Sequence, residues 1–423
     1  MSIPRLASFD STLAFFREGY DFVGNRCRET SSDAFRTRIM LRKVVCMRGA
    51  DAARQFYDGE HFTRAGSMPP TTLRLLQDKG SVQQCDGAHH RARKAMFLGL
   101  LTGPAVDAIV QEFEVAWQDA LPDWRARPSV VLHEEMQRLL CKAACAWAGI
   151  PLTGRELSRR TAEMAAMIDS AGAVSPKVLR ALLLRRRSEA WARRAILRAR
   201  AQEKNDAPVS VLAHHREPDG NLLDLDDAAV ELLNLIRPTV AVARFITFAA
   251  LALHEHPGAV QWLEEDPERR LTAFVHEVRR FYPFFPVIGG RVRQPFEWRG
   301  HYFVSDDWVL LGLYATNHDP ALWGDPQAFR PARFYRREPS AFDLVPQGGG
   351  DHAEDHRCPG EWFTIALIGR ALGLLQQATW GLPQQDLSIA LDRFPTLPAT
   401  GLVVVFARGR PSLLQLASAD PSI

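Results

Sequence analysis

Apolar residues recur along most of this chain at the spacing of amphipathic helices. The pattern predicts a helix over residues 11–29, an almost unbroken helical region over 71–260, and further helices over 267–282 and 362–375. Glycine and proline interrupt the long region, so we expect breaks there. The expected breaks are Gly80, Gly103-Pro104, Pro122, Pro128, Pro151, Ser175-Pro176 and residues 208–221.

Short alternating or apolar runs predict a smaller set of strands. Residues 37–41 and 43–47 are typical of a hairpin, and residues 287–292, 296–304, 308–313 and 402–407 are typical of single strands. A polar, turn-rich passage separates the hairpin from the long helical region. The sequence therefore predicts a mainly α fold with a small β-sheet region. We expect one domain over residues 1–423, with a loose tail at about 411–423.

Composition is that of a folded globular protein. Of the 423 residues, 46% are hydrophobic and 24% are charged, which allows a large core and excludes a disordered chain. The net charge of +3 is too small to indicate a nucleic-acid partner. The first residues do not read as a signal peptide, and we find no run of the ~20 apolar residues that a membrane span needs. These features predict a cytoplasmic protein without a membrane span.

Six cysteines are scattered without a CxxC pair, which suits a reducing compartment. Cys141 and Cys145 share a helix face and could hold a metal, but core packing is the simpler interpretation because no histidine or second pair accompanies them. Cys358 differs. It lies in PQGGGDHAEDHRCPGE, residues 346–361, after three glycines and just before a helical pattern. A helix N-terminus lowers a thiol pKa, so we expect Cys358 to be a thiolate nucleophile or metal ligand.

Two helices carry charges in unusual places. Arg237 and Pro238 interrupt an otherwise apolar helix, where proline should kink the helix and a buried arginine needs an anion. Pairing with an internal acid, or a surface position, would also explain the arginine. In the helix over 267–282, Glu277 and Arg280 are three residues apart and can pair on one face. The segment FRPARF, residues 329–334, follows this helix.

The loop around Cys358 resembles the cysteine-ligand loop of cytochrome P450 enzymes, and QGGG followed by HRCPGE is similar to the fatty-acid peroxygenase branch. The resemblance implies the cytochrome P450 fold and a haem b cofactor whose iron is held by the Cys358 thiolate. It implies that His356 lies near a haem propionate, together with His90, Lys94 and Arg64. It also makes Glu277, Arg280 and Arg333 a buried structural triad. One departure is Asp355, where the family usually has glycine.

The same resemblance gives Arg237 and Pro238 a catalytic meaning. Oxygen-activating relatives usually have an acid and a threonine at this position, whereas the peroxygenase branch has arginine and proline. The arginine would bind a fatty-acid carboxylate, which itself would serve as the acid-base for hydrogen peroxide. Gln83 occupies a position that is histidine in alkene-forming relatives and glutamine in hydroxylating ones. Phe285, Pro286 and Val287 match the segment that lines the substrate pocket, with Phe285 in place of a common glycine.

We therefore expect an oxidoreductase that hydroxylates free fatty acids at the α or β carbon with hydrogen peroxide and without an obligate redox partner. Its catalytic residues would be Arg237, Pro238 and Gln83. Three alternatives remain at this point. They are a decarboxylase that forms terminal alkenes, a dioxygen-dependent monooxygenase that needs redox partners, and a haem-binding sensor without turnover.

Overall fold

A computed structural model describes residues 2–57, 61–78, 80–173 and 175–407. The helices are α1 (Thr12–Glu18), α2 (Phe22–Glu29), α3 (Ala50–Tyr57), α4 (Pro70–Leu76), α5 (Gly87–Leu100), α6 (Gly103–Ala126), α7 (Leu132–Trp147), α8 (Gly154–Asp169), α9 (Lys177–Arg200), α10 (Pro208–Ala213), α11 (Leu225–Ala241), α12 (Ala243–Glu255), α13 (Pro257–Glu265), α14 (Pro267–Phe281), α15 (Leu313–Asn317), α16 (Pro320–Trp323) and α17 (Glu361–Gln377). Short 3₁₀ turns are η1 (Gly19–Asp21), η2 (Val82–Gln84) and η3 (Pro331–Phe334). The strands are β1 (Ala34–Ile39), β2 (Arg42–Met47), β3 (Phe62–Thr63), β4 (Val130–Val131), β5 (Val287–Val292), β6 (Phe296–Trp298), β7 (His301–Phe303), β8 (Trp308–Gly312), β9 (Trp380–Gly381) and β10 (Val403–Phe406).

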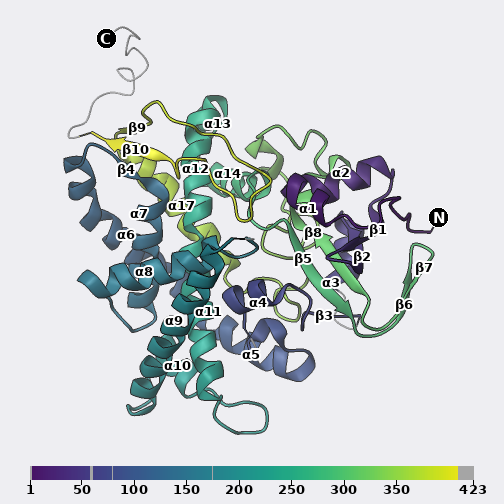
Figure 1. The fold of residues 1–423 in the computed structure, drawn as a ribbon. Coiled ribbons are helices and arrows are strands. Elements are labelled where there is room, and N and C mark those ends of the chain that lie inside the picture. The colour runs from purple at the N-terminus through teal and green to yellow at the C-terminus, as the bar shows by residue number, and fades with distance from the viewer. Residues whose placement is uncertain (1, 58–60, 79, 174, 408–423) are drawn as a thin grey trace.

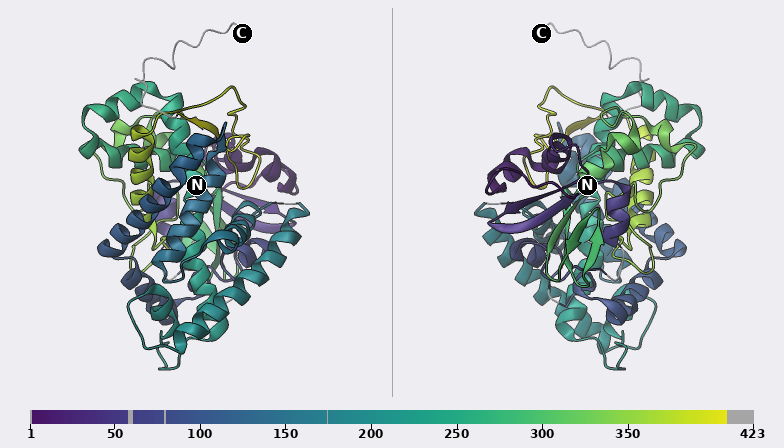
Figure 2. Two further views of the ribbon diagram at one scale, coloured as in Figure 1. Left: turned by 90° about the vertical axis from the view of Figure 1, so that its left-hand side faces the viewer. Right: turned by 90° about the vertical axis from the view of Figure 1, so that its right-hand side faces the viewer.

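Most of the helices occupy one side of the molecule, whereas α1, α2 and α3 lie beside the main sheet on the other side (Figure 1). Helix α11 runs through the helical side and packs against α7, α8, α9 and α12. It is buried along nearly its whole length, which explains why most of its residues are apolar. Figure 2 shows α6 and α8 on one side of the molecule and the sheet on the other. The mainly α fold with a small β region is confirmed.

The five-stranded sheet has the order β1-β2-β8-β5-β3. Strands β1 and β2 form the predicted antiparallel hairpin, with Arg38 opposite Lys43, and β2 pairs in parallel with β8. Strand β10 pairs with β4 and β9 in a smaller sheet, which joins the C-terminal part of the described chain to residues near 130. This long-range pairing supports the single domain over residues 1–423, which stays a prediction.

Several local predictions were wrong. Pro122 does not break a helix but lies inside α6, because Trp117 and Trp124 pack edge to face in the core and hold its last turns. The helix expected over 11–29 is divided at Gly19, whose φ is +56°. A Cβ there would lie 1.9 Å from the carbonyl oxygen of Leu391, so only glycine allows this approach.

The predicted loops also contain regular structure. Helix α3 forms in the passage that the sequence suggested was turn-rich, because Ala52, Ala53, Phe56 and Tyr57 bury one face against the sheet. Helix α10 forms within residues 208–221, and the strand expected over 296–304 is a hairpin of β6 and β7. The tail predicted at 411–423 lies outside the described residues.

One described segment, Leu225–Glu255, is long and apolar enough to cross a membrane by composition, contrary to our reading of the sequence. However, 89% of the apolar 18-residue stretch within this segment is buried inside the protein. A core helix has this pattern, and α11 and α12 are such core helices.

Candidate active site

The cysteine loop, which we define as residues 346–361, begins with glycines that the backbone requires. Gly348 and Gly350 have φ angles of +95° and +90°. A Cβ on Gly349 would lie 2.4 Å from the carbonyl oxygen of Ala341, and a Cβ on Gly348 would lie 2.9 Å from the hydroxyl of Tyr57. The loop therefore passes so close to its neighbours that side chains cannot be added at these positions.

Asp355, the departure from the family pattern, closes a turn within this loop. Its Oδ2 accepts a 2.7 Å hydrogen bond from the backbone N–H of Asp351. The Nζ of Lys94, from α5, donates to the carbonyl oxygen of Asp355 at 2.7 Å and to that of Arg357. The loop is thus held both by its own carboxylate and by a lysine from a distant helix.

Cys358 lies just before α17, as predicted, but the predicted effect of this position on its pKa was wrong. Burial raises the pKa of the Cys358 thiol, and this outweighs the lowering by the Gly360 N–H, Lys94 and Arg279. A bound iron ion would supply the positive charge that favours the thiolate. The Gln347 amide nitrogen lies 3.9 Å from the sulfur and donates to Thr364 at 3.0 Å.

The sequence analysis missed a second set of charges behind this loop. Glu361 accepts hydrogen bonds from Arg279 at 2.5 Å and Arg357 at 2.6 Å. Burial alone would raise the pKa of Glu361, but these two guanidinium groups lower it to about 2. The four-residue spacing of Arg357 and Glu361 in HRCPGE was the available signal for this pair.

Four basic residues expected near a haem are brought together by the fold. Arg64 precedes α4, His90 and Lys94 lie on α5, and His356 lies in the cysteine loop, with the His90 and His356 ring centroids 4.0 Å apart. Burial lowers the pKa of His90 to about 4 and that of Lys94 to about 8, and it also lowers the pKa values of Arg64 and His356. Among the described residues, no ion pair joins these four groups to a carboxylate. A buried basic cluster of this kind fits the two propionate groups of a haem.

The predicted triad is formed. Glu277 accepts two 2.8 Å hydrogen bonds from Arg280, and its Oε2 lies 3.1 Å from Nε of Arg333. The side chains of Glu277 and Arg280 are fully buried. Arg280 also donates to the carbonyl oxygens of Asn317 and Pro326, at 3.0 Å each. The triad thus ties α14 to the segments that follow β8.

Arg237 is a buried guanidinium on α11. It is 4% exposed, its Nη2 donates to Oδ1 of Asn234 at 2.9 Å, and its Nε has no partner. Burial, followed by the charge of Arg185, lowers the pKa of Arg237 to about 9. No carboxylate among the described residues forms an ion pair with it, and it does not lie at the surface. Neither simple alternative from the sequence therefore accounts for this arginine.

Asn234 and Glu231 were not predicted, yet they link the predicted residues of this region. The Asn234 amide donates to Oε2 of Glu231 at 2.9 Å and to Oε1 of Gln83 at 3.3 Å. Glu231 is fully buried and also accepts the backbone N–H of Val82 at 2.7 Å. Its hydrogen bonds and Arg93 act to lower its pKa, but burial dominates and raises it to about 7. The polar positions within the apolar α11 sequence were the available signal.

In the described part of the chain, the remaining predicted residues make no hydrogen bond to this network. Pro238 lies inside α11, which stays helical until Ala241. Phe285 is 39% exposed and packs edge to face on Phe284. Pro286 accepts the backbone N–H of Leu313 at 3.0 Å, and Val287 begins β5. Their role in a pocket stays a prediction.

The chain matches known proteins in both sequence and structure. The family model described as Cytochrome P450 matches residues 270–389, which include the triad and the cysteine loop. The solved structure of cytochrome P450SP alpha (CYP152B1) with (R)-ibuprofen is 44% identical, covers 94% of this chain and 98% of its own, and superposes with a TM-score of 0.91. The chain belongs to the cytochrome P450 family. Within it, this P450 belongs to the fatty-acid peroxygenase branch that its motifs resemble.

Further relatives support the same family membership. Cytochrome P450EX alpha (CYP152N1) with myristic acid is 37% identical over 96% of this P450 and 98% of that chain, with a TM-score of 0.91. An OleT variant in complex with arachidonic acid is 29% identical over 97% of this P450 and all of that chain, with a TM-score of 0.92. Among curated proteins, Cytochrome P450 26B1 of Xenopus tropicalis is 24% identical over 80% of this chain and 73% of its own length.

The family gives this P450 its cofactor, a haem whose iron is ligated by a cysteine thiolate. Cys358 is the candidate ligand, and Arg64, His90, Lys94 and His356 are the candidate propionate contacts. Cys141 and Cys145 are both buried in the core. No group of three metal-binding side chains occurs among the described residues.

Proposed function

We propose that this P450 hydroxylates free fatty acids at the α or β carbon with hydrogen peroxide. The observation that carries the proposal is the buried Arg237 guanidinium, which has no carboxylate partner among the described residues. Burial of a charge without a counter-ion is costly, and a substrate carboxylate would remove that cost. The relatives solved with myristic acid and arachidonic acid support a fatty acid as the substrate.

Arg237 would hold the carboxylate in a fixed orientation. A guanidinium presents parallel N–H groups to the two oxygens of a carboxylate. Asn234 occupies one N–H of Nη2, so the other N–H of Nη2 remains available, together with the neighbouring nitrogen that points the same way. The carbon atoms next to the carboxyl group are then fixed relative to the arginine. This geometry favours oxidation at Cα or Cβ over the end of the chain.

The substrate carboxylate would also move the proton. Pro238 has neither an acid nor a hydroxyl group, so the chain itself has no acid-alcohol pair at this point of α11. A carboxylate bound beside Pro238 can accept a proton from hydrogen peroxide and return it to the leaving oxygen, so that one peroxide and one C–H bond give a hydroxy acid and water. Bound haem supplies the redox chemistry of oxygen transfer.

Gln83 favours hydroxylation over loss of carbon dioxide. Its amide oxygen accepts a hydrogen bond from Asn234, and an amide cannot deliver a proton as an imidazolium can. An enzyme of this kind needs no obligate redox partner, and we propose a cytoplasmic location. The alkene-forming decarboxylase remains the closest alternative.

Mass spectrometry of products tests the proposal. The purified haem protein is mixed with myristic acid and hydrogen peroxide, without a reductase. We expect 2- or 3-hydroxymyristic acid. A terminal alkene as the main product would show that the enzyme decarboxylates fatty acids rather than hydroxylating them. Turnover only with an electron-transfer system would overturn the peroxygenase assignment. Tight binding without any product would indicate a sensor.

A further inference from the structure

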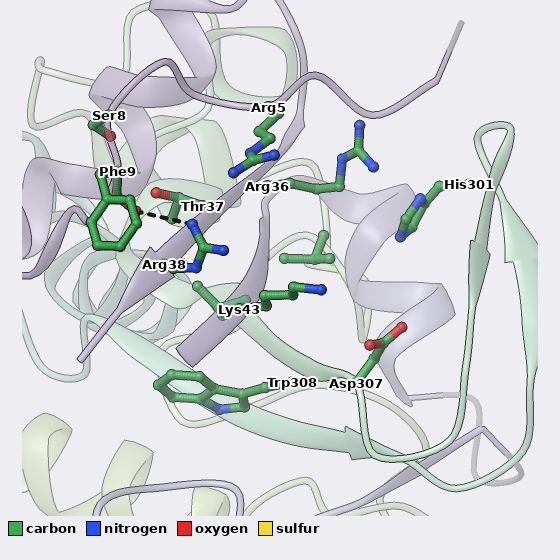
Figure 3. Close-up of a pocket in the computed structure, with 12 residues that line it drawn as sticks. Arg5, Ser8, Phe9, Arg36, Thr37, Arg38, Lys43, His301, Asp307 and Trp308 are labelled. Atoms are coloured by element: carbon green, nitrogen blue, oxygen red, sulfur yellow. Dashed lines mark hydrogen bonds between the residues drawn. The ribbon is translucent and has the colours of Figure 1, made fainter. Parts of the chain in front are cut away.

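A pocket on the outer face of the first sheet gathers positive charge (Figure 3). It has a volume of about 260 Å³, and it lies in the N-terminal hairpin region, at residues outside the candidate active site. Its cations are Arg5, Arg36, Arg38 and Lys43, with His301 at one end. We call these four side chains the cationic pocket.

The fold fixes these cations against one another. Arg36 and Arg38 lie two residues apart on β1 and thus on one face, and Lys43 on β2 is the direct cross-strand partner of Arg38. Arg5 is joined to Arg36 by a backbone bridge. Like charges opposite each other destabilise a strand pair, so the hairpin bears a repulsion that an anion would relieve.

Within the described residues, no carboxylate lies close enough to form an ion pair with the cations of this pocket. None of the four cations forms an ion pair among the described residues, and the buried Nε of Arg36 has no hydrogen-bond partner. Asp307 is the acid that lines the pocket, and its Oδ2 accepts the backbone N–H of Val304 at 2.9 Å. The pocket is therefore complementary to an external anion.

Large exposed apolar side chains lie at and beside this pocket, and one of them, Phe9, lines it, with the Arg38 guanidinium 5.0 Å from its ring centroid. Met40 and Leu41 form the turn between β1 and β2 and are 45% and 71% exposed. Phe9 and Leu13, 72% and 71% exposed, belong to the adjoining segment. That segment is fastened to the turn, because the Met40 N–H donates to Thr12 at 2.5 Å and the Leu41 N–H donates to Asp10 at 2.8 Å. We call these four apolar side chains the apolar tip.

We propose that the cationic pocket and the apolar tip together dock this P450 on a membrane surface that contains anionic phospholipid. The headgroup phosphate meets Arg36, Arg38 and Lys43, while the apolar tip enters the boundary between headgroups and acyl chains. Several large apolar side chains exposed on neighbouring segments suit insertion at a membrane interface, and cations beside them select an anionic lipid surface over a neutral one. Binding is peripheral, and the proposal stands independently of the catalytic function.

Co-sedimentation with lipid vesicles tests this docking surface. The haem-loaded protein is mixed with vesicles of phosphatidylcholine alone, or of phosphatidylcholine and phosphatidylglycerol in a three-to-one ratio. We expect binding to the mixed vesicles that weakens as salt is raised. The double substitution R38E/K43E should lower the partition coefficient more than about twentyfold, since each charge near an anionic surface contributes about fivefold.

Matched variants separate docking from general charge and apolarity. R186E/R187E changes the net charge equally at exposed positions of α9 and should bind as the unaltered protein does. F9S/L41S should weaken binding at every salt concentration, whereas L183S/L197S, on exposed positions of α9, should not. Retained Soret absorbance shows that each variant is folded.

Three results would overturn the proposal. They are equal binding to both kinds of vesicle, equal loss in R38E/K43E and R186E/R187E, and binding of inorganic phosphate at the pocket without any vesicle binding. The last result would make the pocket a site for a soluble anion.

Discussion

Nη2 of Arg237 donates a 2.9 Å hydrogen bond to Oδ1 of Asn234, so an uncharged amide orients the guanidinium. The other end of the amide donates to Glu231, which lies one turn earlier on α11. Because an arginine can only donate and a carboxylate accepts, the asparagine is the residue type that satisfies both neighbours. The arrangement leaves the charge of Arg237 without an internal counter-ion.

Replacing Asn234 by aspartate should weaken fatty-acid binding. The new carboxylate would pair with Arg237 and compete with the substrate, and we expect KM for myristic acid to rise about tenfold or more, which corresponds to about 1.4 kcal/mol. Steady-state kinetics with peroxide measure this effect. N221D, at an exposed loop position, is the matched control. An unchanged KM in N234D would show that Arg237 does not bind the carboxylate.

Replacing Arg237 by alanine should abolish peroxide-driven turnover of fatty acids. The variant loses both the anchor and the means of placing the proton-transferring carboxylate, and we expect kcat/KM to fall at least a hundredfold, or about 3 kcal/mol. R237K keeps a charge but not the parallel N–H groups, so its kcat/KM should lie between that of R237A and that of the unaltered protein. Product formation by R237A at the unaltered rate would contradict the proposed function.

Breaking the triad should affect stability. Glu277→Ala leaves Arg280 buried without its carboxylate, and we expect the free energy of unfolding to fall by about 3 to 5 kcal/mol. Urea denaturation monitored by circular dichroism gives this value. Asp325→Ala removes the partner of the exposed Arg330, and it should cost less than about 1 kcal/mol. Similar losses in both variants would be inconsistent with a special role for the triad.

Adding one methyl group to the cysteine loop should impair haem retention. In Gly349→Ala the new Cβ would meet the backbone oxygen of Ala341 at 2.4 Å, so the loop must move. Gly373→Ala is the matched control, because nothing lies within 4 Å of its Cβ position inside α17. Haem content per protein, from Soret absorbance, should fall only in Gly349→Ala. Full occupancy in that variant would mean that the loop tolerates the displacement.

Acid should destabilise the protein through His133. Burial, with a contribution from Arg244, lowers the pKa of His133 to about 3, below its ordinary value of 6.5. The unfolded chain then binds more protons than the native protein between these pH values, so stability is lost as pH falls below 6.5. His133→Gln should remove about 2 to 3 kcal/mol of the stability change between pH 7 and pH 4.5. Denaturation at both pH values measures this, with exposed His89→Gln as the control.

The periodicity of the sequence was sufficient for the helical bulk and for strands such as β5, because one residue pattern decides them locally. It failed where distant contacts decide the outcome. Pro122 stays in a helix because of tryptophan packing, and α3 forms because it covers the sheet. Glycine correctly predicted a helix boundary at Gly103. The division of the first helix at Gly19 was not predicted, because it depends on a close approach to residue 391.

In the candidate site, sequence motifs identified the charged residues but did not predict the direction of their pKa shifts or their hydrogen-bond partners. HRCPGE and Arg237-Pro238 could be read directly from the chain. The raised pKa of Cys358 could not, because burial depends on the complete fold. The links that join Gln83, Asn234 and Arg237 bring together positions up to 154 residues apart, and no local pattern predicts such contacts.

The contact between Lys94 and the cysteine loop also affects the order of events during biosynthesis. Lys94 emerges from the ribosome early, but Asp355, whose carbonyl oxygen accepts its hydrogen bond, is synthesised 261 residues later. Cys358 follows three residues after that. A nascent chain therefore contains most of the basic cluster long before it contains the thiol, and it cannot complete a haem site until residue 358 has been made. Cofactor capture therefore has to wait until the helices that supply the basic residues and the cysteine loop have both been synthesised.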